Sequence, residues 1–135
     1  MRKPMPYLCA ACQGAKAQSM KPISVYKICP ETAWDEARRA GLYKGSADDL
    51  RDGFIHLSAA AQLAGTARKH FAGQTGLVLV EVEAAKLGTA LKWEISRGGA
   101  LFPHLYADLP VETAVSICHL PLDEEGVPVI PAGLA

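Results

Sequence analysis

Two pairs of polar residues interrupt otherwise apolar segments and could carry chemistry. His56 and Ser58 are separated by a single leucine, and so are His104 and Tyr106. Because side chains at positions i and i+2 of a strand point to the same face, each pair would present an imidazole beside a hydroxyl. Histidine exchanges protons near neutral pH, and hydroxyls both donate and accept hydrogen bonds. The pattern favours a ligand site with His56 and His104 as candidate catalytic residues, but it does not name a reaction.

A predicted helix start and an Arg-Gly-Gly sequence add features that suit an anion. A helix is expected directly after Ser58, and its free N–H groups and partial positive charge favour a nearby phosphate. Arg97 carries a planar guanidinium that suits phosphate or carboxylate, whereas Gly98 and Gly99 let the backbone approach a ligand closely. Together these segments could line a cleft for an anionic, nucleotide-like molecule.

Three further residues extend the candidate site. Trp93 and Phe102 could stack on a ring, and Glu94 could orient a hydroxyl or act as a base. Each candidate also has a purely structural interpretation: the histidines could be satisfied in the core, Ser58 could be a helix N-cap, and Arg97 could be a loop charge. The joint pattern of two His-x-hydroxyl pairs and an Arg-Gly-Gly loop in one small domain is less easily explained by structure alone.

Several enzyme classes lack their sequence motifs here. There is no His-Glu-x-x-His pattern, no nucleophile elbow, no phosphate-binding Walker loop and no Gly-x-Gly-x-x-Gly sequence. Cys9 and Cys12 have the spacing of half a zinc site, but no second close pair exists, so we expect no metal. Cys29 and Cys118 lie in apolar segments and are predicted to be small core residues.

The composition indicates one globular domain without an obligatory charged partner. The 135 residues are 50% hydrophobic and carry 14 basic and 14 acidic side chains. This balance does not point to a nucleic acid or an anionic membrane, although RNA stays open as a ligand because a local basic patch is compatible with it. No apolar run approaches the roughly 20 residues of a spanning helix, so we expect a soluble cytoplasmic protein with a small-molecule partner and leave its oligomeric state open.

The apolar periodicity predicts an α+β fold with a bent, mostly antiparallel sheet and two main helices. The apolar run at 77–82 should be a central strand buried on both faces. Pro103 argues for an edge or irregular strand at 102–106. Residues 42–52 are expected to form a surface turn or one helical turn, and the carboxylates of Asp48, Asp49 and Asp52 are interpreted as solvated rather than as a cation site. The predicted elements are strands at 23–29, 53–58, 77–82, 91–95, 102–106 and 115–120 and helices at 31–40 and 59–71.

The two ends of the chain are predicted to lie outside the folded domain. Residues 1–22 show no sustained period and are interpreted as a disordered extension, with residues 23–131 as the domain and residues 132–135 as a loose end. Met20 precedes the first strand so closely that the residues before it could reflect a misassigned start site.

The same motifs resemble an uncharacterised bacterial family, domain of unknown function 952. The resemblance extends from about Ile23 to Pro131. Its matching segments are Val-Tyr-Lys-Ile-Cys at 25–29, Gly-Phe-Ile-His-Leu-Ser at 53–58, Leu-Lys-Trp-Glu at 91–94, Ser-Arg-Gly-Gly at 96–99 and Phe-Pro-His-Leu-Tyr at 102–106.

This resemblance implies an ADP-ribosyltransferase-like fold with a split sheet, similar to the RNA 2′-phosphotransferase branch. In that branch a Tyr-His pair on the first strand contacts NAD, and the matching residues here are Tyr26 and Lys27. The resemblance implies NAD as the cofactor, with His56 and Ser58 contacting ribose or phosphate. It also implies that Arg97 contacts a phosphate and that His104 or Tyr106 orients the reacting ring, while Glu94 and Glu112 are candidates for a catalytic glutamate.

Two functional hypotheses follow. The first is an ADP-ribosyltransferase-like protein that binds NAD, ADP-ribose or a related nucleotide phosphate, with transferase chemistry as its activity. Such chemistry depends on positioning and electrostatics rather than on a strong nucleophile. The alternative is a non-catalytic nucleotide-binding module that has lost this chemistry, because Lys27 replaces an imidazole and no glutamate matches securely.

Overall fold

The structure is a computed structural model, and it describes residues 23–132 and 134. It is an α+β arrangement with three antiparallel sheets. The strands are β1 (Ser24–Pro30), β2 (Leu42–Tyr43), β3 (Ile55–His56), β4 (Leu77–Glu83), β5 (Leu91–Ile95), β6 (Leu101–Leu105), β7 (Leu109–Pro110) and β8 (Ala114–Leu120). The helices are α2 (Glu31–Ala40), α3 (Ala47–Asp52) and α4 (Leu63–His70), with short 3₁₀ segments at Ala60–Gln62, Ala84–Ala90, Arg97–Gly99 and Val111–Thr113.

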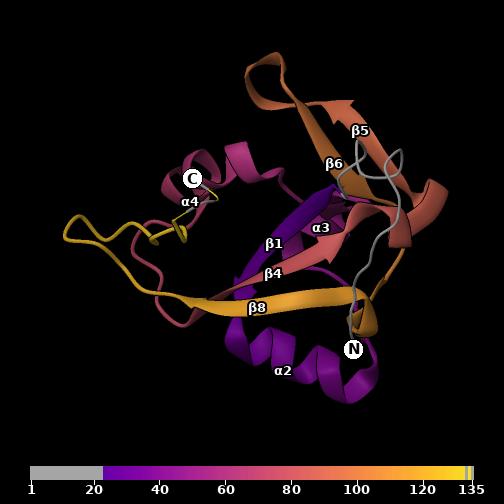
Figure 1. Cartoon of the computed structure of the whole chain (residues 1–135), viewed down its shortest axis with the longest axis horizontal. Coiled ribbons are helices and arrows are strands. Elements are labelled where there is room, and N and C mark those ends of the chain that lie inside the picture. The colour runs from indigo at the N-terminus through magenta and orange to yellow at the C-terminus, as the bar shows by residue number, and fades with distance from the viewer. Residues whose placement is uncertain (1–22, 133, 135) are drawn as a thin grey trace, which may run out of the picture.

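The first large sheet, in the order β1-β4-β8, forms the centre of the fold, with α2 below it and α4 to its side (Figure 1). Strand β4 lies in the middle and is buried along most of its length, which confirms the prediction for residues 77–82. Alternate residues of β1 and β4 enter two different apolar clusters, because successive side chains point to opposite faces. Trp34 of α2 belongs to one cluster and Leu63 of α4 to the other.

Helix α2 has the bounds that the sequence predicts. It follows Pro30, carries Glu31 in its first turn and Arg38 and Arg39 in its last, and ends at Gly41. The backbone of Gly41 has φ 91°, a left-handed conformation that glycine adopts without steric cost. These local signals explain why this helix could be placed from sequence.

The second large sheet has the order β3-β6-β5, and its β5–β6 hairpin projects from the body (Figure 1). The expectation that Pro103 marks an edge strand is wrong, because β6 is the middle strand. Strand β3 pairs only with Leu105 and His104, so Pro103 lies just past its end, where no ladder bond requires the missing N–H group. The Pro103 carbonyl still accepts a hydrogen bond from the Leu57 amide, at 3.0 Å.

The two large sheets meet through one pair of main-chain hydrogen bonds. The Tyr26 amide donates to the Ser58 carbonyl at 2.8 Å, and the Ser58 amide donates to the Tyr26 carbonyl at 2.9 Å. This bridge joins the middle of β1 to the segment just after β3. It fixes the position of the His-Leu-Ser motif relative to the first strand.

Several predicted elements are shorter or divided in the structure. The strand predicted at 53–58 is reduced to Ile55–His56, and the helix predicted at 59–71 is divided into a 3₁₀ turn and α4. The predicted core residue Cys29 is buried, whereas Cys118 is only partly buried.

The predicted extension at 1–22, with Met20, Cys9 and Cys12, lies outside the described residues. Leu134 belongs to the predicted loose end, but it packs against the core. No helix in the described part of the chain is long and apolar enough to cross a membrane.

Candidate functional site

A cleft of about 280 Å³ opens between the two large sheets and is closed on its sides by α3 and α4. Six residues singled out from the sequence line this cleft, namely Tyr26, Lys27, His56, Ser58, Phe102 and His104. They come from β1, the β3 segment and β6, which the Tyr26–Ser58 bridge and the β3–β6 pairing hold together. The structure therefore brings together side chains that lie up to 78 positions apart, from Tyr26 to His104.

Asp49 is the centre of a buried polar network at one end of the cleft. Its carboxylate accepts hydrogen bonds from Lys27 Nζ at 2.9 Å, the Ser46 amide at 2.8 Å and the His56 amide at 3.0 Å. It also lies 2.6 Å from Nδ1 of His56. Burial alone would raise the pKa of Asp49, but the Lys27 ammonium and these hydrogen bonds outweigh it, so the pKa lies below its ordinary value.

The interpretation of the Asp48, Asp49 and Asp52 cluster as a solvated turn is wrong for Asp49, which is only 2% exposed. A capping box orients this residue, because Ser46 Oγ accepts from the Asp49 amide while the Asp49 side chain accepts from the Ser46 amide. Asp48 remains exposed, as expected. The spacing of Ser46 and Asp49 could have indicated the helix start, but not the buried partners.

Lys27 occupies the position at which the resemblance places a histidine. Its ammonium donates to Asp49 Oδ2 at 2.9 Å and to the His56 carbonyl at 3.1 Å, and its side chain is 7% exposed. These contacts tie β1 to α3 and β3. The charge of Lys27 is thus largely used inside the protein, and its stem forms part of the cleft wall.

His56 lies between two carboxylates. Its Nδ1 contacts Asp49, and its Nε2 lies 3.0 Å from Oδ2 of Asp52, at the end of α3. Asp52 also contacts Arg51, whose hydrogen bond is the main cause that lowers the pKa of Asp52. Both ring nitrogens of His56 are therefore engaged within the protein.

His104 has a different arrangement, because only one of its ring nitrogens has a protein partner in the described part of the chain. Nδ1 lies 2.8 Å from Oε1 of Glu94, and the same oxygen accepts from the Tyr106 hydroxyl at 2.7 Å. The hydrogen bonds from His104 and Tyr106 hold the pKa of Glu94 below its ordinary value, whereas the bond to Glu94 raises the pKa of Tyr106. With the proton on Nδ1, the neutral ring presents Nε2 as an acceptor, as in other carboxylate-oriented histidines.

Phe54 packs the two histidines together. Its ring stacks on His104 with centroids 4.1 Å apart and lies 4.6 Å from His56 and 5.2 Å from Tyr106. The two imidazoles are cross-strand neighbours, with ring centroids 5.6 Å apart. This aromatic cluster limits the rotamers of both histidines, which favours a fixed geometry at the cleft.

Ser58 belongs to the opposite wall of the cleft, toward α4. Its hydroxyl lies 3.3 Å from that of Thr66, and the alternative that Ser58 caps the helix does not hold, because the cap position is Ala59. The Ala59 amide donates to the Gln62 side chain at 2.9 Å, so this amide of the helix start is engaged. Thr66, His70 and Phe71 also line the cleft, although no motif in the sequence singles them out.

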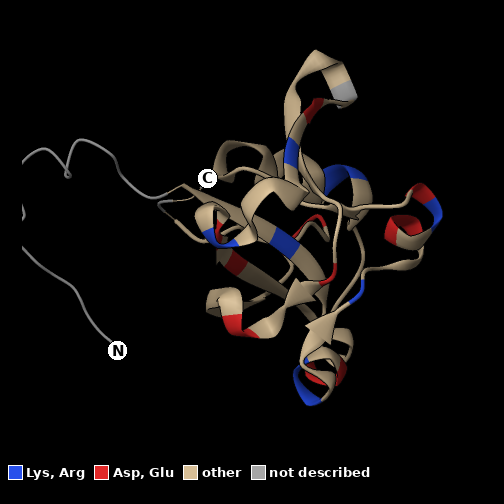
Figure 2. Cartoon of the chain, turned by 90° about the vertical axis from the view of Figure 1, so that its right-hand side faces the viewer, with Lys and Arg blue, Asp and Glu red and all other residues tan. Residues whose placement is uncertain are grey.

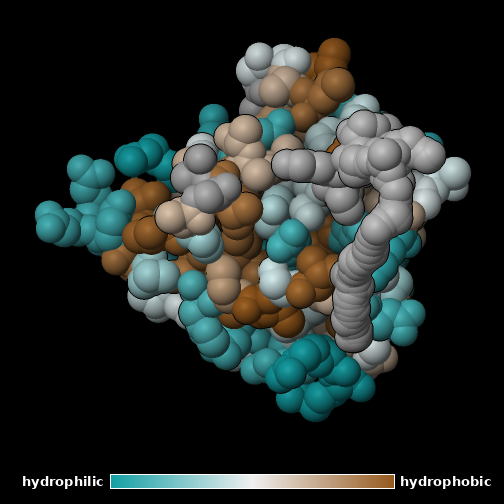
Figure 3. Space-filling model, viewed as in Figure 1, coloured by the Kyte–Doolittle hydropathy of each residue, from teal (hydrophilic) through white to brown (hydrophobic). Residues whose placement is uncertain are grey.

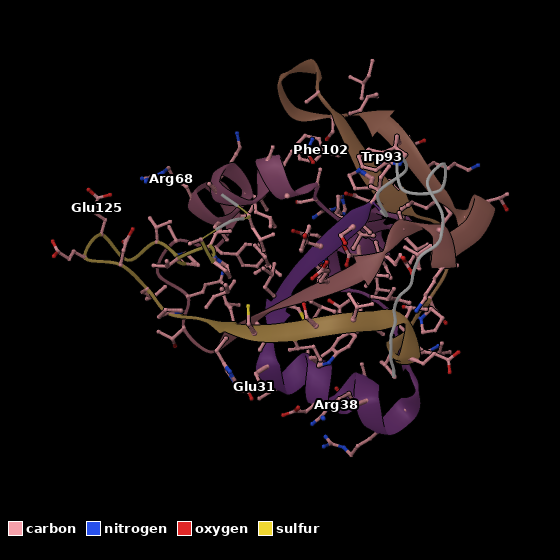
Figure 4. All side chains as sticks on the ribbon, viewed as in Figure 1. Glu31, Arg38, Arg68, Trp93, Phe102 and Glu125 are labelled. Atoms are coloured by element: carbon pink, nitrogen blue, oxygen red, sulfur yellow. The ribbon has the colours of Figure 1, made fainter. Side chains whose placement is uncertain are left out.

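The residues that line the cleft do not include Trp93, Glu94, Tyr106 or Glu112. Trp93 pairs with Pro103 in the hairpin, so it points to the face opposite Phe102 and His104 and is 41% exposed. Figure 4 shows Phe102 on the side of the hairpin toward α4, with Trp93 over β5. Tyr106 contacts Glu94 at the edge of the site, and Glu112 lies in a remote 3₁₀ turn.

Residues 97–99 form the turn at the tip of the hairpin, next to Ser96, which does reach the cleft. Gly98 and Gly99 have the left-handed φ angles of 66° and 80° that glycine adopts without steric cost, and neither is among the residues that line the cleft.

Charge is dispersed over the molecule, with acidic and basic positions interspersed in Figure 2. No cluster of three potential metal ligands occurs among the residues that the structure describes. The fold and site thus define an α+β protein with two antiparallel three-stranded sheets and a polar, histidine-containing cleft between them.

A family model described as "Protein of unknown function (DUF952)" matches residues 28–117. The chain therefore belongs to the DUF952 family. It is similar to protein CC0527 from Caulobacter crescentus, whose crystal structure is 54% identical with a TM-score of 0.77, covering 78% of this chain and 93% of that one. The solution NMR structure of CC0527 gives 54% identity and a TM-score of 0.71, covering 78% and 90% of the two chains. No functionally curated protein matches the sequence.

Proposed function

We propose that this protein is ADP-ribosyltransferase-like and binds NAD, ADP-ribose or a related nucleotide phosphate in the cleft between its sheets, with transferase chemistry at the bound ribose. The observation that carries the proposal is the convergence of His104, Ser58 and Phe102 on one cleft, with a carboxylate behind the histidine. Phe102 and Phe71 offer apolar surface for a ring, and Ser58 and Thr66 offer hydroxyls for ribose or phosphate oxygens.

The size of the cleft limits how much of a dinucleotide it can enclose. Pockets for drug-sized ligands span about 300–1,000 Å³. At about 280 Å³, this cleft lies just below that range. We therefore expect one nucleotide half to be enclosed and the other half to remain at the surface.

The proposed reaction uses His104 as a general base. In this step the bond between the ribose C1 and the nicotinamide nitrogen breaks, and its electron pair leaves with nicotinamide. The oxygen of an acceptor hydroxyl forms the new bond to C1, and its proton moves to Nε2 of His104. Glu94 accepts the hydrogen bond from Nδ1 and so holds the tautomer that this transfer requires.

The second candidate is a non-catalytic nucleotide-binding module, and the contacts of Lys27 and His56 favour it. Both groups are engaged by buried or partly buried carboxylates, so neither is free to meet a ligand without rearrangement. In this case binding would use His104, Ser58 and the aromatic wall, and no bond would be broken.

Titration calorimetry with NAD, ADP-ribose and AMP, followed by a nicotinamide-release assay, distinguishes the two candidates. Binding with turnover supports the transferase, binding without turnover supports the module, and no binding contradicts both. His104→Ala should weaken binding or abolish release. His119→Ala is the matched control, since His119 is an exposed histidine paired with Glu31 and does not line the cleft.

A further inference from the structure

Four ionisable groups form a continuous chain of contacts at the α3 end of the cleft. Lys27 contacts Asp49, Asp49 contacts His56, and His56 contacts Asp52. The charges of Lys27 and Asp49 cancel each other inside the protein. The pair of His56 and Asp52 then remains at the surface of the cleft.

The contacts of the His56 ring determine which of its two nitrogens must carry a proton. An ionised carboxylate only accepts hydrogen bonds, and a neutral imidazole has a single N–H group. Both ring nitrogens of His56 lie within 3.0 Å of a carboxylate oxygen, so both contacts are satisfied together only when both nitrogens carry protons. The ring is then a cation, and its Nε2 lies 3.0 Å from the Asp52 carboxylate as an ion pair.

The two carboxylate partners of His56 differ in how readily they can be exchanged. Asp49 is 2% exposed and is held by Lys27, by the Ser46 amide and by the His56 amide. The side chain of Asp52 is 34% exposed, lies in the last turn of the six-residue helix α3, and has Arg51 as another partner at 3.0 Å. Asp52 can therefore leave His56 and keep an ion pair, whereas Asp49 cannot leave without losing buried hydrogen bonds.

We infer that the phosphate of the ligand binds at Nε2 of His56 by replacing the carboxylate of Asp52. This inference rests on the proposed nucleotide function. It adds a phosphate subsite at which the Asp52 carboxylate competes with the ligand. A phosphate monoester such as that of AMP is the expected ligand group, since it carries more negative charge than the carboxylate it replaces, whereas each phosphate of NAD or ADP-ribose carries one negative charge. Lys27 stays bound to Asp49 and keeps that carboxylate in contact with the histidine.

The exchange has a consequence for affinity. Because the ligand must displace Asp52, wild-type protein binds a phosphate more weakly than a variant without that carboxylate. Removing the charge of Asp48 should have a smaller effect, although Asp48 also lines the cleft and also pairs with Arg51. Among the described contacts, Asp48 has none with His56, so the pair of variants separates direct competition from general electrostatics.

The test compares wild type with Asp52→Asn, Asp48→Asn and Asp108→Asn. Asp108 forms an exposed pair with Lys44 and does not line the cleft, so it controls for net charge. We expect the Kd for AMP to fall about tenfold in Asp52→Asn, which corresponds to about 1.4 kcal/mol. The other two variants should stay within about twofold to threefold of wild type. Equal tightening in Asp48→Asn and Asp52→Asn would overturn the exchange.

NMR of the His56 ring nitrogens separates this inference from the nucleotide proposal. Inorganic phosphate and AMP should each shift the Nε2 resonance of His56 in Asp52→Asn, at lower concentration than in wild type. If phosphate does so while AMP, ADP-ribose and NAD do not bind, the subsite stands and the nucleotide proposal fails. If nucleotides bind without moving the His56 resonances, the nucleotide proposal stands and the exchange is wrong. If neither phosphate nor nucleotide has an effect, both are contradicted.

Discussion

Lys27 Nζ lies 2.9 Å from Oδ2 of Asp49, and the two side chains are 7% and 2% exposed. Removing either partner leaves a buried charge without its counter-ion, which typically costs about 3–5 kcal/mol. We expect Lys27→Met and Asp49→Asn each to lower the free energy of unfolding by that order. The double variant should lose less than the sum, because no charge is then left unpaired.

Urea denaturation of the four proteins in this double-mutant cycle measures the coupling. Lys44→Met is the control, because Lys44 pairs with Asp108 on the surface and exposed pairs contribute about 0–1 kcal/mol. Losses that simply add, or a Lys44 variant as unstable as the Lys27 variant, would contradict the structural role given to the buried pair.

Asp49 also predicts how stability responds to acid. Its folded-state pKa lies below the ordinary value of 3.8, so its stabilising contribution is complete above that value and is lost as the pH falls through the lower folded-state pKa. At neutral pH the contribution is fully present. Asp49→Asn should therefore be less stable than wild type at pH 7, and the difference should shrink below about pH 4. Thermal unfolding between pH 7 and pH 2 measures this, and a constant difference over that range would refute it.

Glu94 predicts an effect that acts through His104. In Glu94→Gln the amide can donate to Nδ1, which places the proton on the opposite nitrogen and removes the acceptor from the cleft. If the protein is a transferase, nicotinamide release should fall about 10²-fold to 10⁴-fold, as for loss of a general base.

Tyr106→Phe is the matched variant for this prediction. It removes the other hydrogen bond to Glu94 but leaves the contact between Glu94 and His104 in place. Its effect on nicotinamide release should be much smaller. Equal losses in the two variants would mean that Glu94 has only a structural role.

The close approach of Gly45 to Asp49 links a turn to the buried polar network around Asp49. Its backbone has φ 111°, and a Cβ added there would lie 2.7 Å from Cβ of Asp49. Gly45→Ala should therefore displace Asp49 as well as strain the backbone. At Gly41, with φ 91°, an added Cβ has nothing within 4 Å, so Gly41→Ala reports backbone strain alone.

Chemical denaturation should show a larger loss of stability for Gly45→Ala than for Gly41→Ala. NMR should show shifts of the His56 ring for Gly45→Ala only, because Asp49 contacts that ring. Equal losses with no shift at His56 would show that the turn and the site are independent.

The parts of the fold that local patterns determine could be predicted from sequence. Helix α2 has its own start and stop residues, and β4 is apolar at nearly every position. The position of β6 in the middle of its sheet could not be predicted. It depends on how short the partner strand β3 is, and tertiary contacts decide that length. Pro103 is tolerated in a middle strand only for that reason.

The candidate site was predicted in part, and the misses have a geometric reason. Strand alternation places His104 and Phe102 on the cleft face and Trp93 on the other, and the cross-strand register decides this. The partners of Asp49 lie 22 and 7 positions away in the sequence, so periodicity cannot find them. Asp49 and Asp52 were for this reason missed as functional groups, whereas Glu94 was a candidate from the sequence.

The hairpin beyond the cleft carries apolar side chains, visible as brown atoms at its tip in Figure 3. Ile95 and Leu101 are 73% and 52% exposed there and form a cross-strand pair. They share the face of Trp93, not the face that lines the cleft. The two faces of this hairpin therefore differ in chemistry as well as in position.

The two large sheets are joined next to the cleft by main-chain atoms, since Tyr26 and Ser58 meet through their amides and carbonyls. Hydrogen bonds between main-chain groups do not depend on which side chains the two residues carry. Proteins with this fold can therefore replace the residues that line the cleft, and so change the ligand, without losing the contact between the two sheets.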